Sequence, residues 1–149
     1  MPVTEEIRPA DREDLPFLLQ LEQQAFCPPW TEAMLREELD SPDARVLIYA
    51  DTEPVGFAVY HRAGDQAELY QIAVLPEKRR RGIAAALLAA GDRAAGDMAC
   101  TSLFLEVRAS NEAAVCLYEA GGYHQIGKRK KYYVNPVEDA LLYCKELKP

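Results

Sequence analysis

The sequence predicts an α/β fold in which a mixed, mostly antiparallel central sheet carries helices on both faces. Two observations predict it. Three alternating, strand-like runs follow one another with only short turns between them, and the strand-like runs after them are separated by amphipathic helices. The resulting order, β-α-α-β-β-β-α-β-α-β-β, buries a sheet between helical layers. With 149 residues, the chain has the length of one domain over residues 1–149.

The N-terminal part is predicted to contain a short strand and two helices. Asp11 is a good N-cap for an amphipathic helix, and Cys27-Pro28-Pro29 ends that helix because proline cannot continue it. Thr31 then caps the second helix. The predicted bounds are residues 7–9 for the strand, about 11–25 for the first helix and about 31–39 for the second.

An antiparallel meander of three strands comes next, because turn segments at 51–54 and 63–65 separate three apolar runs. A long helix, a fifth strand, a second helix and a closing hairpin complete the fold. Asn111 is predicted to cap the later helix, which Gly121-Gly122 ends. The predicted bounds are 45–51, 54–62 and 66–75 for the meander, 82–97 for the long helix, 102–108 for the fifth strand, 111–120 for the later helix, and 122–130 and 138–147 for the hairpin around Asn135-Pro136.

The composition excludes several classes of function. A net charge of −7 disfavours a nucleic-acid partner, which would require phosphate neutralisation, and suits a cationic substrate. The longest apolar run, 83–90, is too short to span a bilayer, and the acidic N-terminal segment MPVTEEIRPA is unlike a signal peptide. The scattered spacing of the cysteines predicts reduced thiols, no metal site and a cytoplasmic location. These cysteines are Cys27, Cys100, Cys116 and Cys144.

The most informative segment is IAVLPEKRRRGIA at 72–84, a strand-like run followed by a basic turn and an alanine-rich helix. The first amides of a helix have no acceptor within it, so such a strand–turn–helix unit binds anions. Gly82 allows a phosphate group to approach the backbone, Ala84 keeps the next position small, and the lysine and arginines at 78–81 add cationic donors. The alternative is a solvated run of charges before a surface helix.

Here the sequence resembles a known family. Arg79-x-x-Gly82-x-Ala84 resembles the acetyl-CoA signature of the GNAT acetyltransferase superfamily, Q/R-x-x-G-x-G/A. Residues 103–123, LFLEVRASNEAAVCLYEAGGY, are similar to the pattern LEVRxSNxxAxxLYExxGF of its RimI-like branch, the bacterial ribosomal-protein-alanine N-acetyltransferases, and depart from it at Gly121 and Tyr123. Two further segments resemble this branch and other protein N-terminal acetyltransferases, PWTE at 29–32 and KRKKYYVNPVEDALLY at 128–143.

This resemblance implies the GNAT fold, in which the fourth and fifth strands splay apart and the pantetheine arm of acetyl-CoA enters between them. Acetyl-CoA is then the co-substrate, and no metal is required. The residues implied to bind it, through main chain or side chain, are Ile72, Ala73, Val74, Arg79, Arg80, Arg81, Gly82, Ile83, Ala84, Ala85 and Asn111.

Glu106 and Tyr118 are the candidate catalytic residues. A carboxylate in the apolar run LFLEV is costly unless it is paired or used, and burial would raise its pKa toward the working range. Glu106 matches the family's general base, although an exposed strand-end glutamate is an alternative and Glu68 is a rival base. Tyr118 matches the family's acid tyrosine, because a phenol with a pKa of about 10 can protonate a departing thiolate. The alternative for Tyr118 is packing of the helix onto the sheet.

The acceptor is predicted to be a peptide. The resemblance implies that Tyr132 and Tyr133 hold the substrate backbone; an ordinary strand pair is the alternative, and Trp30 fits either the core or the groove wall. At pH 7.4 an α-amine is roughly a quarter to a third neutral, whereas only about 0.1% of a lysine side chain is, so the site suits α-amines. Acidic residues of the second predicted helix would favour a basic second residue if they face the groove. They are Glu32, Glu37, Glu38 and Asp40.

Together these features predict an acetyl-CoA-dependent protein Nα-acetyltransferase that acts by direct transfer. The resemblance points to the N-terminal alanine of a small-subunit ribosomal protein as the substrate, and to a cytoplasmic monomer without a nucleic-acid or membrane partner. Two alternatives stay open. One is acetylation of a small-molecule amine, which a long open groove would disfavour. The other is a non-catalytic acyl-CoA-binding module, which the presence of Glu106 and Tyr118 disfavours.

Overall fold

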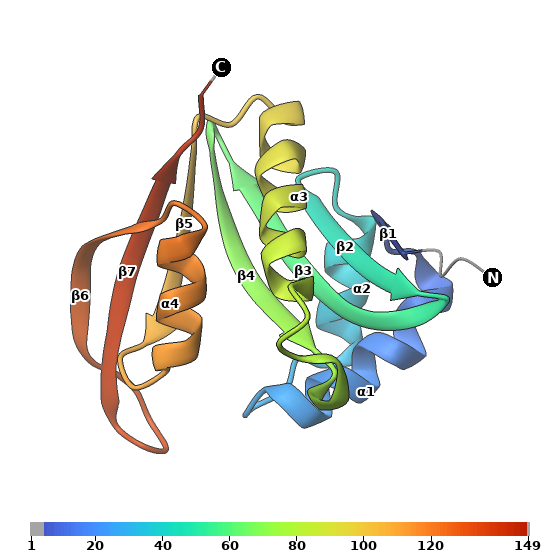
Figure 1. Ribbon diagram of the computed structural model, residues 1–149, viewed down its shortest axis with the longest axis horizontal. Coiled ribbons are helices and arrows are strands. Elements are labelled where there is room, and N and C mark those ends of the chain that lie inside the picture. The colour runs from blue at the N-terminus through green and yellow to red at the C-terminus, as the bar shows by residue number, and fades with distance from the viewer. Residues whose placement is uncertain (1–4, 149) are drawn as a thin grey trace.

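A computed structural model describes residues 5–148 and arranges them around a seven-stranded sheet with the strand order β1-β2-β3-β4-β5-β7-β6. Helices α1 and α2 cover one face, and α3 and α4 cover the other (Figure 1). The predicted mixed, mostly antiparallel sheet between helices is confirmed. The elements are β1 (Glu5–Pro9), α1 (Leu15–Ala25), α2 (Glu32–Asp40), β2 (Ala44–Asp51), β3 (Glu53–Ala63), β4 (Gln66–Val74), α3 (Ile83–Asp97), β5 (Ser102–Arg108), α4 (Glu112–Ala120), β6 (His124–Tyr133) and β7 (Glu138–Glu146), with short 3₁₀ turns η1 (Arg12–Asp14) and η2 (Pro76–Lys78).

The N-terminal caps form where the sequence predicts them, with one difference. Asp11 caps the 3₁₀ turn η1 rather than α1 itself. The Asp14 carboxylate accepts a hydrogen bond from the Asp11 amide, so the two residues form a capping box ahead of α1. Thr31 accepts a hydrogen bond from the Met34 amide (3.2 Å) and begins α2. Asn111 caps α4 in the same way through Ala114 (3.2 Å).

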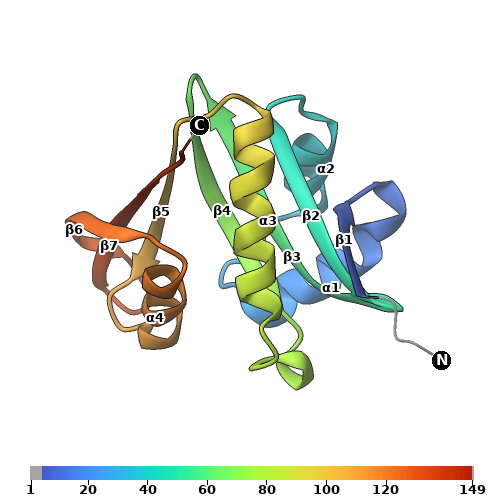
Figure 2. The ribbon, with the colours of Figure 1, turned by 45° about the horizontal axis from the view of Figure 1, so that its top comes forward.

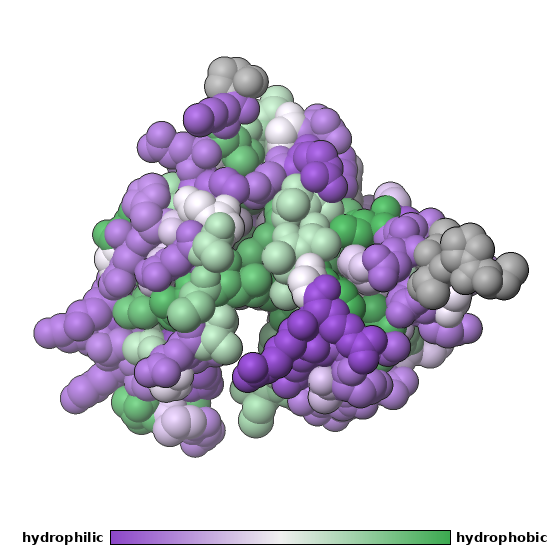
Figure 3. Space-filling model, viewed as in Figure 1, coloured by the Kyte–Doolittle hydropathy of each residue, from purple (hydrophilic) through white to green (hydrophobic). Residues whose placement is uncertain are grey.

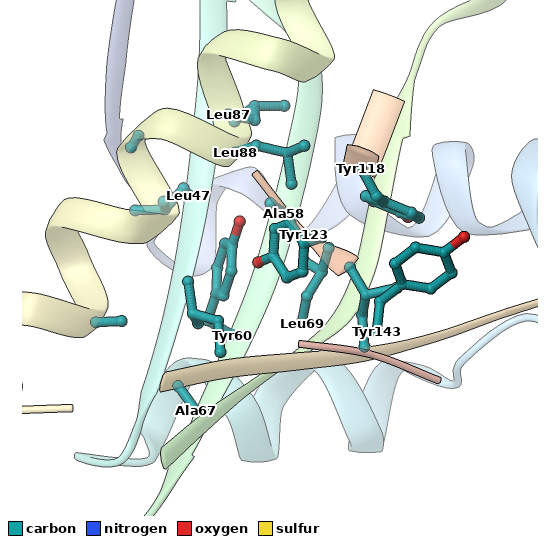
Figure 4. Packing of buried hydrophobic residues seen from close by; sticks show 14 of the residues in the cluster. Leu47, Ala58, Tyr60, Ala67, Leu69, Leu87, Leu88, Tyr118, Tyr123 and Tyr143 are labelled. Carbon is teal, nitrogen blue, oxygen red and sulfur yellow. The ribbon is translucent and has the colours of Figure 1, made fainter. Parts of the chain in front are cut away.

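Two apolar cores lie on the two faces of the sheet. Leucines of α1 and α2 pack against β2 and β3 on one face. On the other face, Leu87 and Leu88 of α3 pack with Tyr60 of β3, Leu69 of β4 and Tyr143 of β7 (Figure 4). Side chains of β2, β3 and β4 alternate between the two cores, whereas the core residues of β5 and β7 belong only to the core under α3 and α4.

The functional geometry begins at the junction of β4 and β5, the one parallel pair in the sheet. Only three residue pairs join these strands, Gln66 to Ser102, Ala67 to Leu103 and Glu68 to Phe104. Beyond them the strands diverge, and the two parts of the sheet separate (Figure 2). Tyr70 explains part of the divergence. It is an extra residue in β4, because Val59 pairs with Gln71 and Tyr60 with Leu69, and such a bulge bends and twists a strand.

Charged residues in the motif near the C-terminus stabilise the hairpin of β6 and β7. Glu138 accepts hydrogen bonds from Arg108 (3.1 Å) and from the Ser110 amide (3.2 Å), and Asp139 accepts one from the Lys131 amide (2.9 Å). The hairpin is thereby tied to the end of β5. Within residues 5–148, none of the helices has the length and apolarity that crossing a membrane requires.

Candidate active site

A cleft of about 1220 Å³ opens where β4 and β5 diverge. In the space-filling view the molecule is hollowed between the part that carries α4 and the part that carries the turn before α3, and the turn side is strongly hydrophilic (Figure 3). Nearly all residues singled out from the sequence line this one cleft, whereas Arg81 does not. Those that line it are Ile72, Ala73, Val74, Arg79, Arg80, Gly82, Ile83, Ala84, Ala85, Glu106, Asn111, Tyr118, Tyr132 and Tyr133.

The turn before α3 has the geometry of an anion site. Gly82 is the N-cap of α3 and has a left-handed backbone (φ +78°), which L side chains rarely adopt. The first helical hydrogen bond runs from the Ala86 amide to the Gly82 carbonyl (3.0 Å), so the amides of residues 83–85 have no acceptor within the helix. A Cβ atom at Gly82 would meet no protein atom within 4 Å, which leaves open space beside those amides.

The arginines of this turn differ in their placement. The Nε atom of Arg79 donates to the Val74 carbonyl (3.2 Å), which fixes its side chain at the end of β4. Arg80 has a positive φ of 64° and also lines the cleft, whereas Arg81 is exposed outside the lining. Of the three arginines, Arg79 and Arg80 are therefore placed beside the cleft.

The wall formed by β4 offers main chain as well as side chains. Ile72, Ala73 and Val74 pair on one edge with β3, and their other edge faces the cleft because pairing with β5 ends at Glu68. Ala73 and Val74 are also buried in the cores. Core packing and an available backbone edge therefore coexist in this segment.

Glu106 lies on the cleft side of β5 and is less buried than expected. Leu105 and Val107 face the core under α3 and α4, so the alternation of β5 turns Glu106 to the opposite face, which is not covered there by a helix. Its side chain is 24% exposed, and its Oε1 atom lies 3.4 Å from Nε of Arg129. The carboxylate is thus ion-paired at the cleft surface rather than enclosed in apolar surroundings.

The rival carboxylate, Glu68, is on the same face, at the last residue pair before the strands diverge. Loss of hydration raises its pKa, and the negative charge of Glu106 raises it further, while Arg129 and His61 oppose the shift. Glu68 does not line the cleft itself. Only Glu106 therefore faces the interior of the cleft.

Tyr118 combines the two roles that the sequence left open. Its side chain is 7% exposed and packs edge-on against Tyr123 with ring centroids 6.0 Å apart, yet it also lines the cleft. Burial raises the pKa of Tyr118 to about 12. The phenol is therefore protonated at neutral pH and available as a proton donor.

The other end of the cleft is lined by aromatic side chains. Tyr132 and Tyr133 pack edge-on with centroids 5.2 Å apart, and the Arg108 guanidinium lies 4.2 Å from the centroid of the Tyr133 ring. Trp30 is half-buried and lines the cleft, so it is both core and wall. Tyr70 lines it as well, a residue that sequence reasoning did not single out.

The acidic residues of α2 do not act as one group. Glu32 pairs with Arg36 (2.8 Å), Asp40 pairs with Arg12 (3.1 Å), and Glu37 is exposed. Only Glu38 reaches toward the sheet, where its Oε2 atom lies 2.9 Å from Nδ1 of His61. Three of the four are therefore directed elsewhere.

A buried polar group behind the cleft was also missed from the sequence. Glu22 of α1 is fully buried, and its Oε1 atom accepts hydrogen bonds from the Trp30 amide (2.8 Å) and from Nε2 of Gln71 (3.1 Å). Its other oxygen has no partner within residues 5–148, and burial raises the pKa of Glu22. The available signal was its spacing, because Glu22 follows Leu18 by four positions on the apolar face of α1.

No group of three or more histidine, cysteine, aspartate or glutamate side chains within the described part of the chain is placed to hold a metal ion. The arrangement instead combines an anion-binding turn, an open strand edge, a carboxylate and a protonated phenol along one cleft. These are the parts needed to hold a phosphate-bearing thioester and to move protons during acyl transfer.

Comparisons with known proteins agree with this geometry. The acetyltransferase (GNAT) family matches residues 15–123. The [ribosomal protein bS18]-alanine N-acetyltransferase of Salmonella typhimurium is 35% identical over 131 residues, covering 87% of this chain and 88% of that protein. The enzyme of the same name from Haemophilus influenzae is 32% identical over 123 residues, covering 83% of this chain and 84% of the relative.

Solved structures share the fold. The crystal structure of the ribosomal-protein-S18-alanine N-acetyltransferase from Escherichia coli has a TM-score of 0.87 and 30% identity, covering 98% of this chain and 96% of its own. Arabidopsis thaliana NAA60, solved in complex with acetyl-CoA, has a TM-score of 0.86 at 19% identity and covers 96% of this chain and 99% of its own. The second likeness concerns the fold alone.

Proposed function

The chain belongs to the GNAT family of acetyltransferases, and we propose that it transfers the acetyl group of acetyl-CoA to the N-terminal amine of a protein. Several relatives are named [ribosomal protein bS18]-alanine N-acetyltransferase, and we propose the N-terminal alanine of a ribosomal protein as the acceptor here. The observation that carries the proposal is the single cleft that joins the anion-binding turn before α3, Glu106 with Tyr118, and the tyrosine pair of the hairpin.

We assign the binding of acetyl-CoA, which supplies the activated acetyl group as a thioester, to the turn and to the open edge of β4. The amides of residues 83–85 and the side chains of Arg79 and Arg80 bind the pyrophosphate, because unpaired amides and guanidinium groups are strong donors to phosphate. Gly82 keeps the approach clear. The backbone edge of 72–74 pairs with the amide groups of the pantetheine arm.

We assign the proton transfers to Glu106 and Tyr118. Glu106 accepts a proton from the incoming ammonium group, directly or through water, and the neutral amine then attacks the thioester carbonyl. The C–N bond forms, the C–S bond breaks, and Tyr118 donates its proton to the departing thiolate. The acetylated nitrogen loses its second proton to water, and a proton from water restores the Tyr118 phenol. Burial raises the pKa of Tyr118, so the phenol is still protonated when the thiolate leaves, but the same shift makes it a weaker acid for this step.

We assign the acceptor peptide to the end of the cleft between the α1–α2 connection and the hairpin. Trp30, Tyr132 and Tyr133 line this part of the cleft, and the side chain of Tyr132 is 49% exposed. The Tyr133 ring is held by Arg108, and Arg108 is in turn held by Glu138 (3.1 Å). A single accessible carboxylate suits an α-amine, which is already partly neutral at pH 7.4, better than a lysine side chain.

A panel of acceptors tests the proposal. Peptides with a free N-terminal alanine should be acetylated, while the same peptides with a blocked N-terminus and an internal lysine should react far more slowly. Tyr132→Ala and Tyr133→Ala should each raise the KM for the peptide and leave the Kd for acetyl-CoA close to that of the wild type. If the enzyme preferred free lysine or polyamines over every peptide, the acceptor would be a small-molecule amine and not a peptide. The assignment as an acetyltransferase would remain.

A further inference from the structure

A second cavity, of about 250 Å³, lies between α3 and α4 and adjoins the cleft. Alanine, leucine and glycine residues form most of its wall, and Ala85 and Leu117 line both the cavity and the cleft. Because these small residues leave the space unfilled, apolar packing does not lock α3 against α4 here. Two charged residues complete the wall, Asp92 of α3 and Lys145 of β7.

Lys145 joins the two helices at this cavity. Its Nζ atom donates hydrogen bonds to Oδ2 of Asp92 and to the Gly121 carbonyl (2.6 Å), just beyond the last residue of α4. We call these two contacts the Lys145 bridge. A lysine at this position also suits the negative end of the α4 dipole. The bridge therefore links the helix that begins at the anion-binding turn to the helix that carries Tyr118.

Buried hydroxyl groups surround the Asp92 end of the bridge. The hydroxyl group of Tyr123 points toward Tyr60, and the Tyr60 ring lies against Gly91 of α3, where an added Cβ atom would overlap it (Figure 4). Burial raises the pKa of both tyrosines, and the charge of Asp92 raises both further. Lys145 is the one cation paired with Asp92 in the described part of the chain, so its loss would leave a largely buried carboxylate unpaired.

The residues that end α4 are fitted to the bridge. Gly122 has a positive φ of 96°, and a Cβ atom added there would lie 3.1 Å from Cε of Lys145, which is tighter than an ordinary contact. Residues 103–123 depart from the pattern of the RimI-like branch at Gly121 and Tyr123. The first accepts a hydrogen bond from Lys145, and the second lies beside Asp92. The departures from the branch pattern therefore coincide with the bridge.

The Gly121 end of the bridge holds the turn that carries Tyr118. The Tyr118 carbonyl accepts hydrogen bonds from the amides of Gly121 (3.0 Å) and Tyr123 (3.0 Å), and the Tyr118 ring packs edge-on against Tyr123. A shift of Gly121 would therefore move the backbone of Tyr118. Displacing a reacting group by about 1 Å can cost about 100-fold in rate.

We propose that Lys145 is a positioning residue for acyl transfer. Through the Lys145 bridge it sets the position of Tyr118 relative to α3, and so relative to a thioester anchored at the turn before α3. This inference rests on the proposed function, because it requires Tyr118 to protonate the departing thiolate. The anion-binding turn belongs to α3 alone, so the bridge governs turnover and not the affinity for acetyl-CoA.

A double-mutant cycle tests the bridge with a peptide that has a free N-terminal alanine. The four enzymes are the wild type, Lys145→Met, Tyr118→Phe and the combined variant. Lys145→Met should lower kcat about 10-fold in the wild-type background and leave the Kd for acetyl-CoA within about 2-fold of the wild type. In the Tyr118→Phe background it should change kcat by less than about 2-fold, because the proton donor that it would misplace is already absent. Lys145→Arg, which keeps a long cationic donor, should recover about half of the wild-type kcat.

Arg62→Met is the matched control. Arg62 also joins a carboxylate, Asp43 (2.6 Å), to the carbonyl at the end of a helix, Met98 (3.2 Å), but all three residues lie on the other side of the divergence of β4 and β5 from Tyr118. This variant should lose stability and keep the wild-type kcat. Asp92→Asn removes the charge with little change of shape and should lower kcat in the same background-dependent way, so it serves if Lys145→Met does not fold.

The outcomes separate the bridge from the proposed function. If Lys145→Met lowered kcat equally in both backgrounds, or left it unchanged in the wild-type background, the bridge would not act through Tyr118 and the proposal would be overturned. An equal loss of kcat in Arg62→Met would overturn it as well. In each case peptide acetylation by the wild type would still support the proposed function. If the wild type acetylated no peptide, the proposed function would fail, and the role of the bridge would fail with it.

Discussion

At the scale of single residues, Glu106 and Tyr118 reach the same cleft from opposite environments. Glu106 is on the uncovered face of β5 and is ion-paired with Arg129, whereas Tyr118 is buried in α4 and keeps its proton. The Glu106 carboxylate can accept a proton from the ammonium group of the acceptor. The Tyr118 phenol keeps its proton until the thiolate departs. Their separate environments support separate roles.

The roles can be tested by substitution. Glu106→Gln and Tyr118→Phe should each lower kcat by about 10²- to 10⁴-fold, because each removes one proton-transfer group without changing the shape of the cleft. The Kd for acetyl-CoA, measured by calorimetry, should stay close to the wild-type value. For Glu106→Gln the deficit should shrink as pH rises, because the amine then loses its proton unaided. A deficit that stays constant with pH would show that Glu106 positions the acceptor instead.

Glu22 permits a second test, of stability rather than rate. Its pKa is raised in the folded state, so the folded protein binds this proton more tightly than the unfolded chain does. The resulting stabilisation is fully present below the unfolded pKa and is lost as pH rises through the folded pKa. Glu22→Gln keeps an acceptor for Trp30 and carries no charge. Its free energy of unfolding relative to the wild type should therefore increase between pH 4.5 and pH 8, by about 1.4 kcal/mol for each unit of pKa shift.

Urea denaturation at the two pH values measures this difference, with Glu37→Gln as the exposed control. If the difference in the free energy of unfolding did not change with pH, the inference that burial raises the pKa of Glu22 would be contradicted. The spacing of Glu22 after Leu18 placed it on the apolar face of α1, but a glutamate in an amphipathic helix is ordinarily solvated, and no local pattern shows the hydrogen bond that it accepts from Gln71, 49 positions away. Glu106 and Tyr118, by contrast, were identified through a local motif, although the partial exposure of Glu106 depends on which helices cover β5.

At the scale of elements, the turn before α3 depends on one backbone conformation. Gly82→Val should weaken acetyl-CoA binding strongly, because a branched side chain would fill the open space beside the helix amides and the positive φ would be strained. Gly64 is the matched control. It also has a positive φ, 65°, and no protein atom within 4 Å of an added Cβ, but it lies in the β3–β4 turn outside the cleft. Both variants should lose stability by about 1–2 kcal/mol.

Only the Gly82 variant should lose affinity, which calorimetry with acetyl-CoA would show. Equal affinity in both variants would remove the turn from the binding site.

The turn was predictable because strand, glycine and helix are adjacent in the chain. The bulge at Tyr70 was not, since it arises from a register shift between β3 and β4, and no local pattern marks the extra residue. For the same reason the sequence predicted the bounds of β4 closely but not the cause of its bend.

At the scale of the whole molecule, the unit formed by β5, α4 and the hairpin joins the rest of the sheet through three residue pairs. Acetyl-CoA would span the opening between the two parts. In hydrogen exchange, the amides of residues 69–74 that face the cleft should therefore exchange rapidly in the free protein and slowly with CoA bound. The amides of 47–49 in β2, whose residues pair with both β1 and β3, should not respond. An unchanged rate across 69–74 would mean that the ligand does not bind along β4.

The same open edge has a consequence for self-association. An unpaired strand edge is ordinarily a template onto which other polypeptides add, and exposed edges of this kind promote aggregation. Here the free edge of β4 lines a cleft whose opposite side is formed by residues of β5 and α4, so an added strand would have to enter that cleft. The pantetheine arm carries side groups only on its pantoate part, and the rest of it is a thin chain of amides. The divergence of β4 and β5 thus favours a thin ligand arm over a polypeptide strand. It also keeps the unpaired backbone edge of β4 inside a cleft, where neighbouring molecules cannot readily pair with it.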